Sequence, residues 1–141
     1  MDAKNDIGQL KERLNNDIND IDAALSLGNL YYDMNDAPSS IVYYRRVLDL
    51  NPALSSARTD LGAMYWRNDD IGLAEQAFRD AIANDSSFAQ AYVNLGLLLR
   101  HARGKIAEAR AVWQQLLAVN PDHALAAKAR ELLQETASSI N

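Results

Sequence analysis

The sequence of 141 residues contains no cysteine. Disulfide bonds, thiolate zinc sites and cysteine nucleophiles are therefore excluded. Histidine is also scarce, because the only two are His101 and His123, and neither belongs to a closely spaced metal-binding pair. We expect both to be surface or helix-capping residues.

Other features of a catalytic site are missing as well. The chain has no glycine-rich phosphate-binding loop and no nucleophile-elbow motif. The adjacent carboxylates Asp69 and Asp70 are expected in a turn, where such acids are usually solvated and cap a helix. We therefore predict that the protein is not an enzyme and that it holds no metal or cofactor.

Basic charge and long apolar runs are also in short supply. Lysine and arginine number 14 against 19 for aspartate and glutamate, so the net charge is −5. This balance argues against nucleic acid and against an anionic membrane surface as partners. No run of 18 apolar residues and no signal-peptide pattern occurs. We expect a soluble protein of the cytoplasm or periplasm, or the soluble part of an anchored protein, with no direct membrane insertion.

A repeated pattern is the most informative feature that the sequence does contain. Leu27-Gly28, Leu61-Gly62 and Leu95-Gly96 recur at an interval of 34 residues. Each glycine inside a helix costs roughly 1 kcal/mol relative to alanine, so a threefold recurrence indicates a packing requirement. An interval of this length is typical of an array of helix-turn-helix units.

Further positions recur in step with the glycines. Matching residues of the first two copies are Tyr31 and Tyr65, Ser40 and Ala74, Tyr44 and Phe78, and Val47 and Ala81. The later landmarks of the third copy come one residue late, which predicts an extra residue in the turn around Gly104. These landmarks are Ala109, Trp113, Leu116 and Pro121. We expect glycine and the later Ala or Ser to bring two antiparallel helices together, while the large residues fill the gap to the next pair. The large residues are Tyr31, Tyr44, Tyr65, Phe78 and Trp113.

In these residues the chain resembles the tetratricopeptide repeat (TPR) family. The family pattern of Leu-Gly, Tyr, Ala, Phe, Ala and Pro is matched in three repeats, at about 21–54, 55–88 and 89–123. The family's Trp position holds Ala24 and Arg58. The resemblance implies a single all-α domain that forms a right-handed superhelical array of antiparallel helix pairs, an α-solenoid.

The expected helices of the three pairs follow from this register. They cover about 21–34 and 39–50, 55–67 and 71–84, and 88–102 and 105–119. An additional helix within residues 1–20 is either the second helix of a decayed repeat, an N-terminal cap, or a segment that lies in the groove. A final helix that starts near Asp122 and covers 124–136 caps the last repeat, and residues 137–141 form a frayed tail.

The resemblance also implies a binding surface. In this family the first helix of each pair lines a concave groove, and positions 2, 5, 6, 9, 12 and 13 of each repeat tend to face into it. We therefore take ten residues as the candidate partner-binding groove. They are Asn29, Tyr32, Asp60, Ala63, Trp66, Arg67, Asn94, Leu97, Arg100 and His101.

One class of partner is excluded by the same register. Relatives that hold the acidic C-terminal tails of chaperones use a carboxylate clamp of Lys, Arg and Asn side chains. The matching positions here hold Leu25, Asn29, Asp60, Gln90 and Asn94. Only Asn29 fits, and Asp60 would repel a carboxylate, so we predict that this clamp is absent.

Trp66 is the residue that we expect to anchor a partner. Tryptophan, tyrosine and arginine dominate interface hot spots, and Trp66 lies beside Tyr32, Arg67, Leu97 and Arg100 in the predicted groove. The partner would be a helix or extended segment with an apolar residue and some acidic character toward the two arginines. The alternative is that Trp66 packs against a neighbouring helix.

Three functions remain open on the sequence alone. The first is a protein-interaction module, an adaptor or assembly scaffold that binds a protein or peptide. The second is a scaffold that self-associates by head-to-tail stacking, because residues 1–36 are acidic and residues 100–135 are basic on balance. The third follows from residues 109–121, which are similar to the last repeat of bacterial TPR proteins of cytochrome c assembly and imply an apocytochrome partner.

Overall fold

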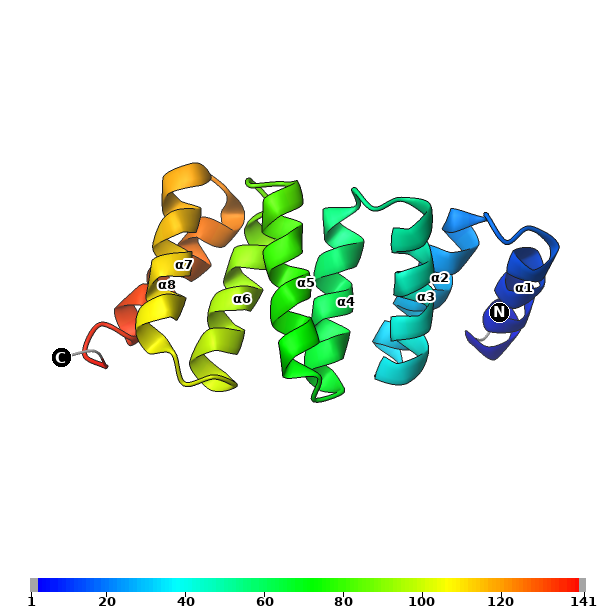
Figure 1. The fold of residues 1–141 in the computed structure, drawn as a ribbon, viewed down its shortest axis with the longest axis horizontal. Coiled ribbons are helices and arrows are strands. Elements are labelled where there is room, and N and C mark those ends of the chain that lie inside the picture. The colour runs from blue at the N-terminus through cyan, green and yellow to red at the C-terminus, as the bar shows by residue number, and fades with distance from the viewer. Residues whose placement is uncertain (1–2, 140–141) are drawn as a thin grey trace.

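The computed structural model describes residues 3–139, with side chains described from residue 6 onward. Over this range the chain forms helices and turns and no strand. The helices stand side by side in an elongated row, with α1 at one end and α8 at the other (Figure 1). In chain order they are α1 (Ala3–Asn16), α2 (Ile21–Asp33), α3 (Ala37–Leu50), α4 (Ser55–Arg67), α5 (Ile71–Asn84), α6 (Ala89–His101), α7 (Ile106–Val119) and α8 (Ala124–Glu135).

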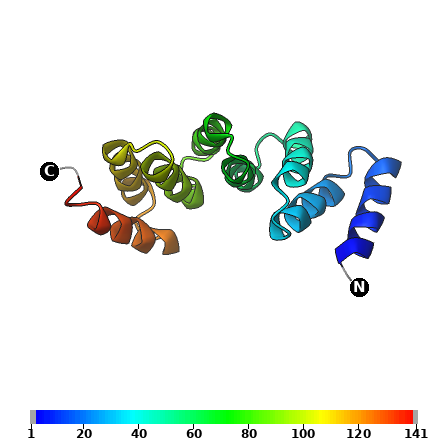
Figure 2. The same cartoon turned by 90° about the horizontal axis from the view of Figure 1, so that it is seen from below.

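The helices confirm the predicted all-α array of pairs. α2 pairs with α3, α4 with α5 and α6 with α7, and each pair packs on the next. The additional helices extend the row at its two ends, because α1 packs on α2 and α8 packs on α6 and α7. Seen from below, the row of helices is arched (Figure 2).

The turns inside the three pairs repeat as the helices do. Asn35, Asp69 and Gly104 have φ angles of 60°, 62° and 66°, in the left-handed region that few residues other than glycine adopt. Three residues separate the helices of the first two pairs and four separate those of the third. This difference confirms the extra residue predicted near Gly104.

Two residues that were expected to cap helices, His123 and Asp70, lie at the N-terminal ends of α8 and α5. The backbone N–H of Leu125 donates a hydrogen bond of 3.0 Å to Nδ1 of His123, so His123 caps α8 as expected. His101 is exposed at the end of α6. Asp70 is the N-cap residue of α5, as expected, but its carboxylate accepts a hydrogen bond of 2.9 Å from Asn68 and none from the backbone of α5.

Each repeated glycine lies against an aromatic ring of the second helix in its own pair. A Cβ atom added to the glycine would lie 2.7 Å from the ring of Tyr44 at Gly28, 2.5 Å from that of Phe78 at Gly62 and 2.0 Å from that of Trp113 at Gly96. The rings also reach the following helices, as expected, because Tyr44 shares a buried cluster with residues of α4 and Phe78 shares one with residues of α6. Glycine makes room for a ring within the pair, which is why a side chain is missing at this position.

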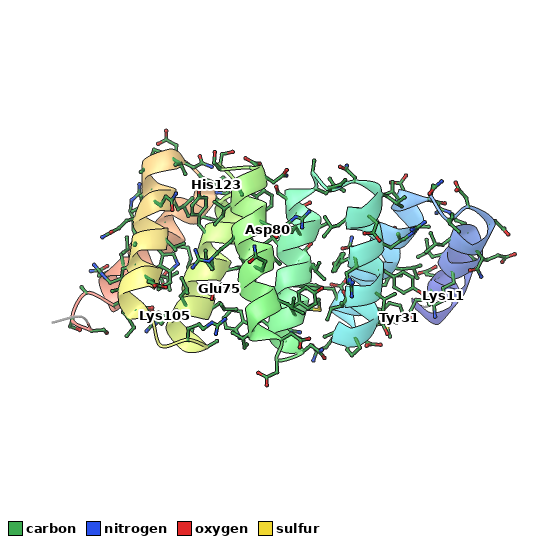
Figure 3. The ribbon with its side chains drawn as sticks, in the orientation of Figure 1. Lys11, Tyr31, Glu75, Asp80, Lys105 and His123 are labelled. Atoms are coloured by element: carbon green, nitrogen blue, oxygen red, sulfur yellow. The ribbon has the colours of Figure 1, made fainter. Side chains whose placement is uncertain are left out.

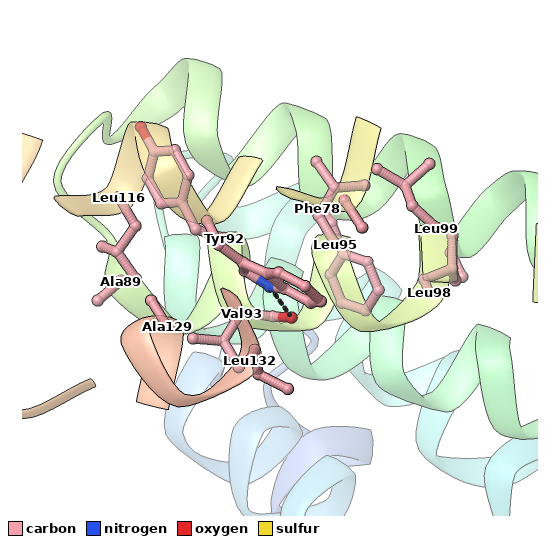
Figure 4. Packing of buried hydrophobic residues seen from close by; sticks show 13 residues of the cluster. Phe78, Ala89, Tyr92, Val93, Leu95, Leu98, Leu99, Leu116, Ala129 and Leu132 are labelled. Atoms are coloured by element: carbon pink, nitrogen blue, oxygen red, sulfur yellow. Dashed lines mark hydrogen bonds between the residues drawn. The ribbon is translucent and has the colours of Figure 1, made fainter. Parts of the chain in front are cut away.

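Trp113 shows how closely the third pair is packed. Its side chain is fully buried, and the indole Nε1–H donates a hydrogen bond of 3.5 Å to the carbonyl oxygen of Val93 (Figure 4). Leu95, Leu98 and Leu99 of α6 belong to the same buried cluster. The prediction that Trp113 serves packing and not recognition is thereby confirmed.

Contacts between side chains hold α1 at the N-terminal end of the row. Nζ of Lys11 lies 5.7 Å from the ring centre of Tyr31 (Figure 3), and Tyr31 stacks on Tyr43 of α3 with 5.8 Å between ring centres. Arg13 forms an ion pair of 3.1 Å with Asp20, just before α2. Of the positions considered for the N-terminal helix, the one observed is at the end of the array, against α2.

The C-terminal end is fastened by a buried threonine. Thr136 is fully buried, and its Oγ1 accepts a hydrogen bond of 2.8 Å from Nη1 of Arg110 on α7. The same hydroxyl donates to the carbonyl oxygen of Leu132 at 2.8 Å. Residues 137–141 were expected to form a frayed tail. The backbone N–H groups of Ala137 and Ser139 donate hydrogen bonds to the turn before them. Residues 140–141 lie outside the described residues.

Candidate functional site

Two adjoining hollows lie on the first helices of the pairs, where the groove is predicted. The Asp60 hollow has a volume of about 340 Å³ and is lined by Asn29, Tyr32, Asp33, Tyr44 and Asp60. The Trp66 hollow has a volume of about 420 Å³ and is lined by Tyr32, Ala63, Trp66, Arg67, Phe78 and Asn94. Tyr32 lines both hollows, so they form one continuous surface across α2, α4 and α6.

The Asp60 hollow contains negative charge without a matching cation. Asp60 is half-buried, and burial raises the pKa of its carboxyl group to about 6. Neither Asp60 nor Asp33 forms an ion pair or a side-chain hydrogen bond with any residue whose side chain is described. At pH 7 the Asp60 carboxylate is mostly ionised, because its raised pKa of about 6 still lies below that pH. The hollow is therefore suited to a positively charged group.

A buried tyrosine closes the floor of the same hollow. Tyr44 donates a hydrogen bond of 2.7 Å from its hydroxyl to Oδ1 of Asn29. Burial, together with the charge of Asp60, raises the pKa of Tyr44 well above its usual range. Tyr44 therefore stays neutral and keeps the Asn29 side chain oriented in the hollow.

The Trp66 hollow is less polar and is bordered by one cation. Trp66 is half-buried: part of its side chain packs against the cluster around Phe78, and part lines the hollow. The two alternatives for Trp66, groove lining and packing, thus both describe part of its surface. Arg67 is exposed, and its Nη1 donates a hydrogen bond of 2.5 Å to Asn35.

Three of the ten candidate residues lie outside both hollows. Leu97 is half-buried and packs against the core. Arg100 forms an ion pair of 3.1 Å with Glu135 of α8, so its charge is already matched. His101 is exposed at the C-terminal end of α6. The other seven candidates line one hollow or both.

The positions that correspond to the carboxylate clamp offer no cation. Leu25 packs against the core cluster of the first two pairs. Gln90 donates a hydrogen bond of 2.7 Å to Asn94, so these two amides engage each other. With Asp60 unpaired beside them, this surface favours a positive group over a carboxylate.

Two aromatic residues and one acid that line the hollows are not among the ten candidates. Tyr44 and Phe78 come from α3 and α5 and reach the groove from below, between the first helices. Their repeat positions predicted burial, and both are buried, but no one-dimensional pattern shows that a buried ring also forms the floor of a hollow. Asp33 occupies a groove position of the repeat, and only its place beside Asp60 marks it as part of the site.

Features of other site types are missing from the part of the chain that the structure describes. Among these residues no group of three or more His, Asp or Glu side chains is arranged to hold a metal ion. None of the described helices is sufficiently long and apolar to cross a membrane. The two adjoining hollows lie where the repeat register predicts the groove.

Comparison with solved structures places this architecture among TPR proteins. MamA matches with a TM-score of 0.79 and 23% identity, over 93% of this chain and 77% of MamA. The TPR2B domain of yeast Sti1, solved in a complex with pHsp70, matches with a TM-score of 0.76 and 17% identity, over 84% of this chain and 97% of that domain. The first TPR domain of Spaghetti (RPAP3), bound to an HSP90 peptide, matches with a TM-score of 0.67 and 27% identity, over 82% and 96% of the two chains.

Comparison of sequences supports the same assignment. No curated protein matches the sequence significantly. The family described as the Cilia and flagella-associated protein 70 middle TPR-like domain matches residues 30–139. This range is most of the chain and runs from the last turn of α2 through α8. The chain therefore belongs to the family of Cilia and flagella-associated protein 70 middle TPR-like domains, and its fold is a TPR solenoid.

Proposed function

We propose that this chain is a protein-interaction module whose concave groove binds a segment of a partner protein through the two adjoining hollows. A basic side chain of the partner occupies the Asp60 hollow, and an apolar side chain occupies the Trp66 hollow. The observation that carries this proposal is the pair of unmatched carboxylates, Asp33 and Asp60, beside a half-exposed tryptophan in one continuous surface.

Charge decides between a basic and an acidic partner. A lysine or arginine that enters the Asp60 hollow gains two carboxylates and the ring of Tyr32, a combination suited to cations. An acidic segment would instead meet Asp60 with like charge in a partly desolvated place. The acidic character first expected opposite Arg67 and Arg100 is not part of the proposal, because Glu135 already matches Arg100.

The HSP90 peptide held by Spaghetti does not define the partner here. That peptide, SRMEEVD, contains three acidic residues, and this chain has no lysine or arginine at the positions of the carboxylate clamp. The similarity of fold therefore supports binding of a peptide segment in general, and the local charge favours a segment of opposite sign.

The likeness of residues 109–121 to cytochrome c assembly proteins gives no separate support. Ala109, Trp113 and Leu116 are the buried residues of α7, so the shared pattern reflects how a second helix packs. It lies on the opposite helix layer from the groove. An apocytochrome partner is consequently not proposed.

A positional-scanning library of fluorescent decapeptides tests the proposal. Binding to the purified protein is followed by anisotropy, with one position fixed at a time. We expect mixtures with a fixed Lys or Arg to bind about tenfold tighter than those with a fixed Asp or Glu, a difference of about 1.4 kcal/mol. Equal or tighter binding of the acidic mixtures would refute the charge preference.

Variants locate the binding within the groove. Asp60→Asn should abolish the preference for basic mixtures, whereas the control Asp49→Asn, at an exposed position of α3, should keep it. Trp66→Ala should weaken the best mixture by about 2 kcal/mol. Unchanged binding by both Asp60→Asn and Trp66→Ala would show that peptides bind elsewhere on the protein.

A further inference from the structure

α1 occupies the position of the second helix of an incomplete pair. Its register follows from the repeat interval, because Asp6, Gln9, Leu10 and Arg13 each lie 68 residues, or two repeats, before a buried residue of α5. Those residues are Ala74, Ala77, Phe78 and Ala81, which face the first helix of their own pair. The corresponding face of α1 is therefore the face on which a first helix would pack.

That position is hollow in the described structure. The four residues of α1 and four residues of α2 line a space of about 430 Å³, which we call the N-terminal hollow. Its lining consists of Asp6, Gln9, Leu10, Arg13, Ser26, Asn29, Leu30 and Asp33. Among the described residues no helix lies between these two walls.

Apolar side chains on both walls remain partly uncovered as a result. Leu10 and Leu30 are only partly buried, whereas the residues at the same repeat positions are covered. The position of Leu10 is held by Phe78 in the second pair. The position of Leu30 is held by Met64 and Leu98 in the second and third pairs. The exposed fraction of all three side chains is 0%. A helix in the N-terminal hollow would therefore bury apolar surface that the rest of the array buries.

The charges of α1 are arranged so that a second copy of the same helix matches them. Within a pair the two helices run antiparallel. A two-fold axis midway between Gln9 and Leu10 places Asp6 opposite Arg13 of the second copy, and Gln9 opposite Leu10. Arg13 uses Nε and Nη2 for Asp20, which leaves Nη1 to donate across the axis. Such an interface is isologous, the commonest kind in soluble homodimers.

The second wall of the hollow also favours α1 as the occupant. α1 carries three basic and two acidic residues, whereas α2 carries two acidic residues and no basic one.

We propose that two copies of the chain form a two-fold dimer through the N-terminal hollow, in which each copy supplies α1 as the missing first helix of the other. Asp6 of each copy pairs with Arg13 of the other, and the two copies of Leu10 and Leu30 are covered. This dimer is closed, unlike head-to-tail stacking of α8 on α1, which would generate open chains.

A charge-exchange experiment by analytical ultracentrifugation tests this dimer. The single variants Asp6→Arg and Arg13→Asp each place like charges together twice and should raise the dimer dissociation constant about tenfold or more. An equimolar mixture of the two variants restores both ion pairs and should form a heterodimer close to the wild-type strength. The control Asp49→Arg on α3 should dimerise as the wild type does.

Further measurements separate a folding defect and the groove from the interface. Leu10→Gln, whose circular dichroism should match that of the wild type, should also weaken the dimer, and Asp60→Asn should not. The proposal is overturned if the wild type is monomeric at all concentrations up to millimolar, if it forms open chains, or if the charge-exchanged mixture stays monomeric. Dimerisation by Asp6→Arg alone at wild-type strength would overturn it equally.

Discussion

Replacing Gly96 with alanine tests the packing rule that sets the repeat interval. The new Cβ atom would lie 2.0 Å from Nε1 and 2.3 Å from Cε2 of Trp113. Atoms that close cannot coexist, and the indole has no room to move because it is fully buried. The substitution therefore forces the helices of the third pair apart or moves the ring out of its place.

The expected magnitude combines two opposing effects. Alanine gains about 1 kcal/mol over glycine from helix propensity, while an extra group in a filled core costs about 1–3 kcal/mol. Because the overlap here is severe, we expect the cost to lie at the upper end. The net loss is about 2 kcal/mol, which lowers the melting temperature of a chain of this size by about 6 °C.

Thermal and urea unfolding followed by circular dichroism measures this change. Gly8→Ala is the matched control, because a Cβ atom at Gly8 in α1 meets no atom within 4 Å and should leave stability equal or higher. Trp113→Leu should cost less in the Gly96→Ala background than alone, a coupling that a double-mutant cycle detects. The packing rule fails if Gly96→Ala is as stable as the wild type.

Three other changes have defined outcomes. Asp60→Asn should raise the free energy of unfolding at pH 7 by about 1 kcal/mol. The pKa of Asp60 is about 6 in the folded protein and 3.8 in the unfolded chain. The free energy of unfolding of the wild type therefore falls as pH rises between these two values. The variant lacks this carboxyl group and should show no such fall. Thr136→Val should cost about 1 kcal/mol in urea unfolding, because Arg110 and Leu132 lose a hydrogen-bond partner. Acrylamide should quench the fluorescence of half-buried Trp66 and not that of Trp113, and a bound peptide should protect it.

The sequence was sufficient for the helices because their signals are local and repeat. The 34-residue interval, the turn residues and the positions of apolar residues all agree, so helix ends were predicted within about three residues. The extra residue near Gly104 could also be predicted, since it displaces every later landmark of the third copy by one.

The sequence predicts which face of each helix is buried better than it predicts the distance between two packed helices. Periodicity placed Gly96 and Trp113 on facing surfaces but could not show that the ring contacts the glycine directly, because this depends on how closely the two backbones approach. The same limit applies to the groove, whose floor includes Tyr44 and Phe78 from the second helices.

Electrostatic partners far apart in the sequence were the least predictable part of the site. Arg100 meets Glu135 of α8, 35 residues later, and this contact removes a cation from the predicted groove. Asp60 shows the opposite case, since its sequence neighbours give no sign that burial raises the pKa of its carboxyl group to about 6. Both results change the expected charge of a partner from acidic to basic.

The binding of fluorescent decapeptides to wild type and Asp60→Asn tests the central claim most directly. The wild type should bind mixtures with a fixed Lys or Arg about tenfold tighter than mixtures with a fixed Asp or Glu, and Asp60→Asn should bind both alike. A wild-type preference for the acidic mixtures, or a basic preference that survives in Asp60→Asn, would contradict the assignment of the Asp60 hollow as the site for a basic side chain.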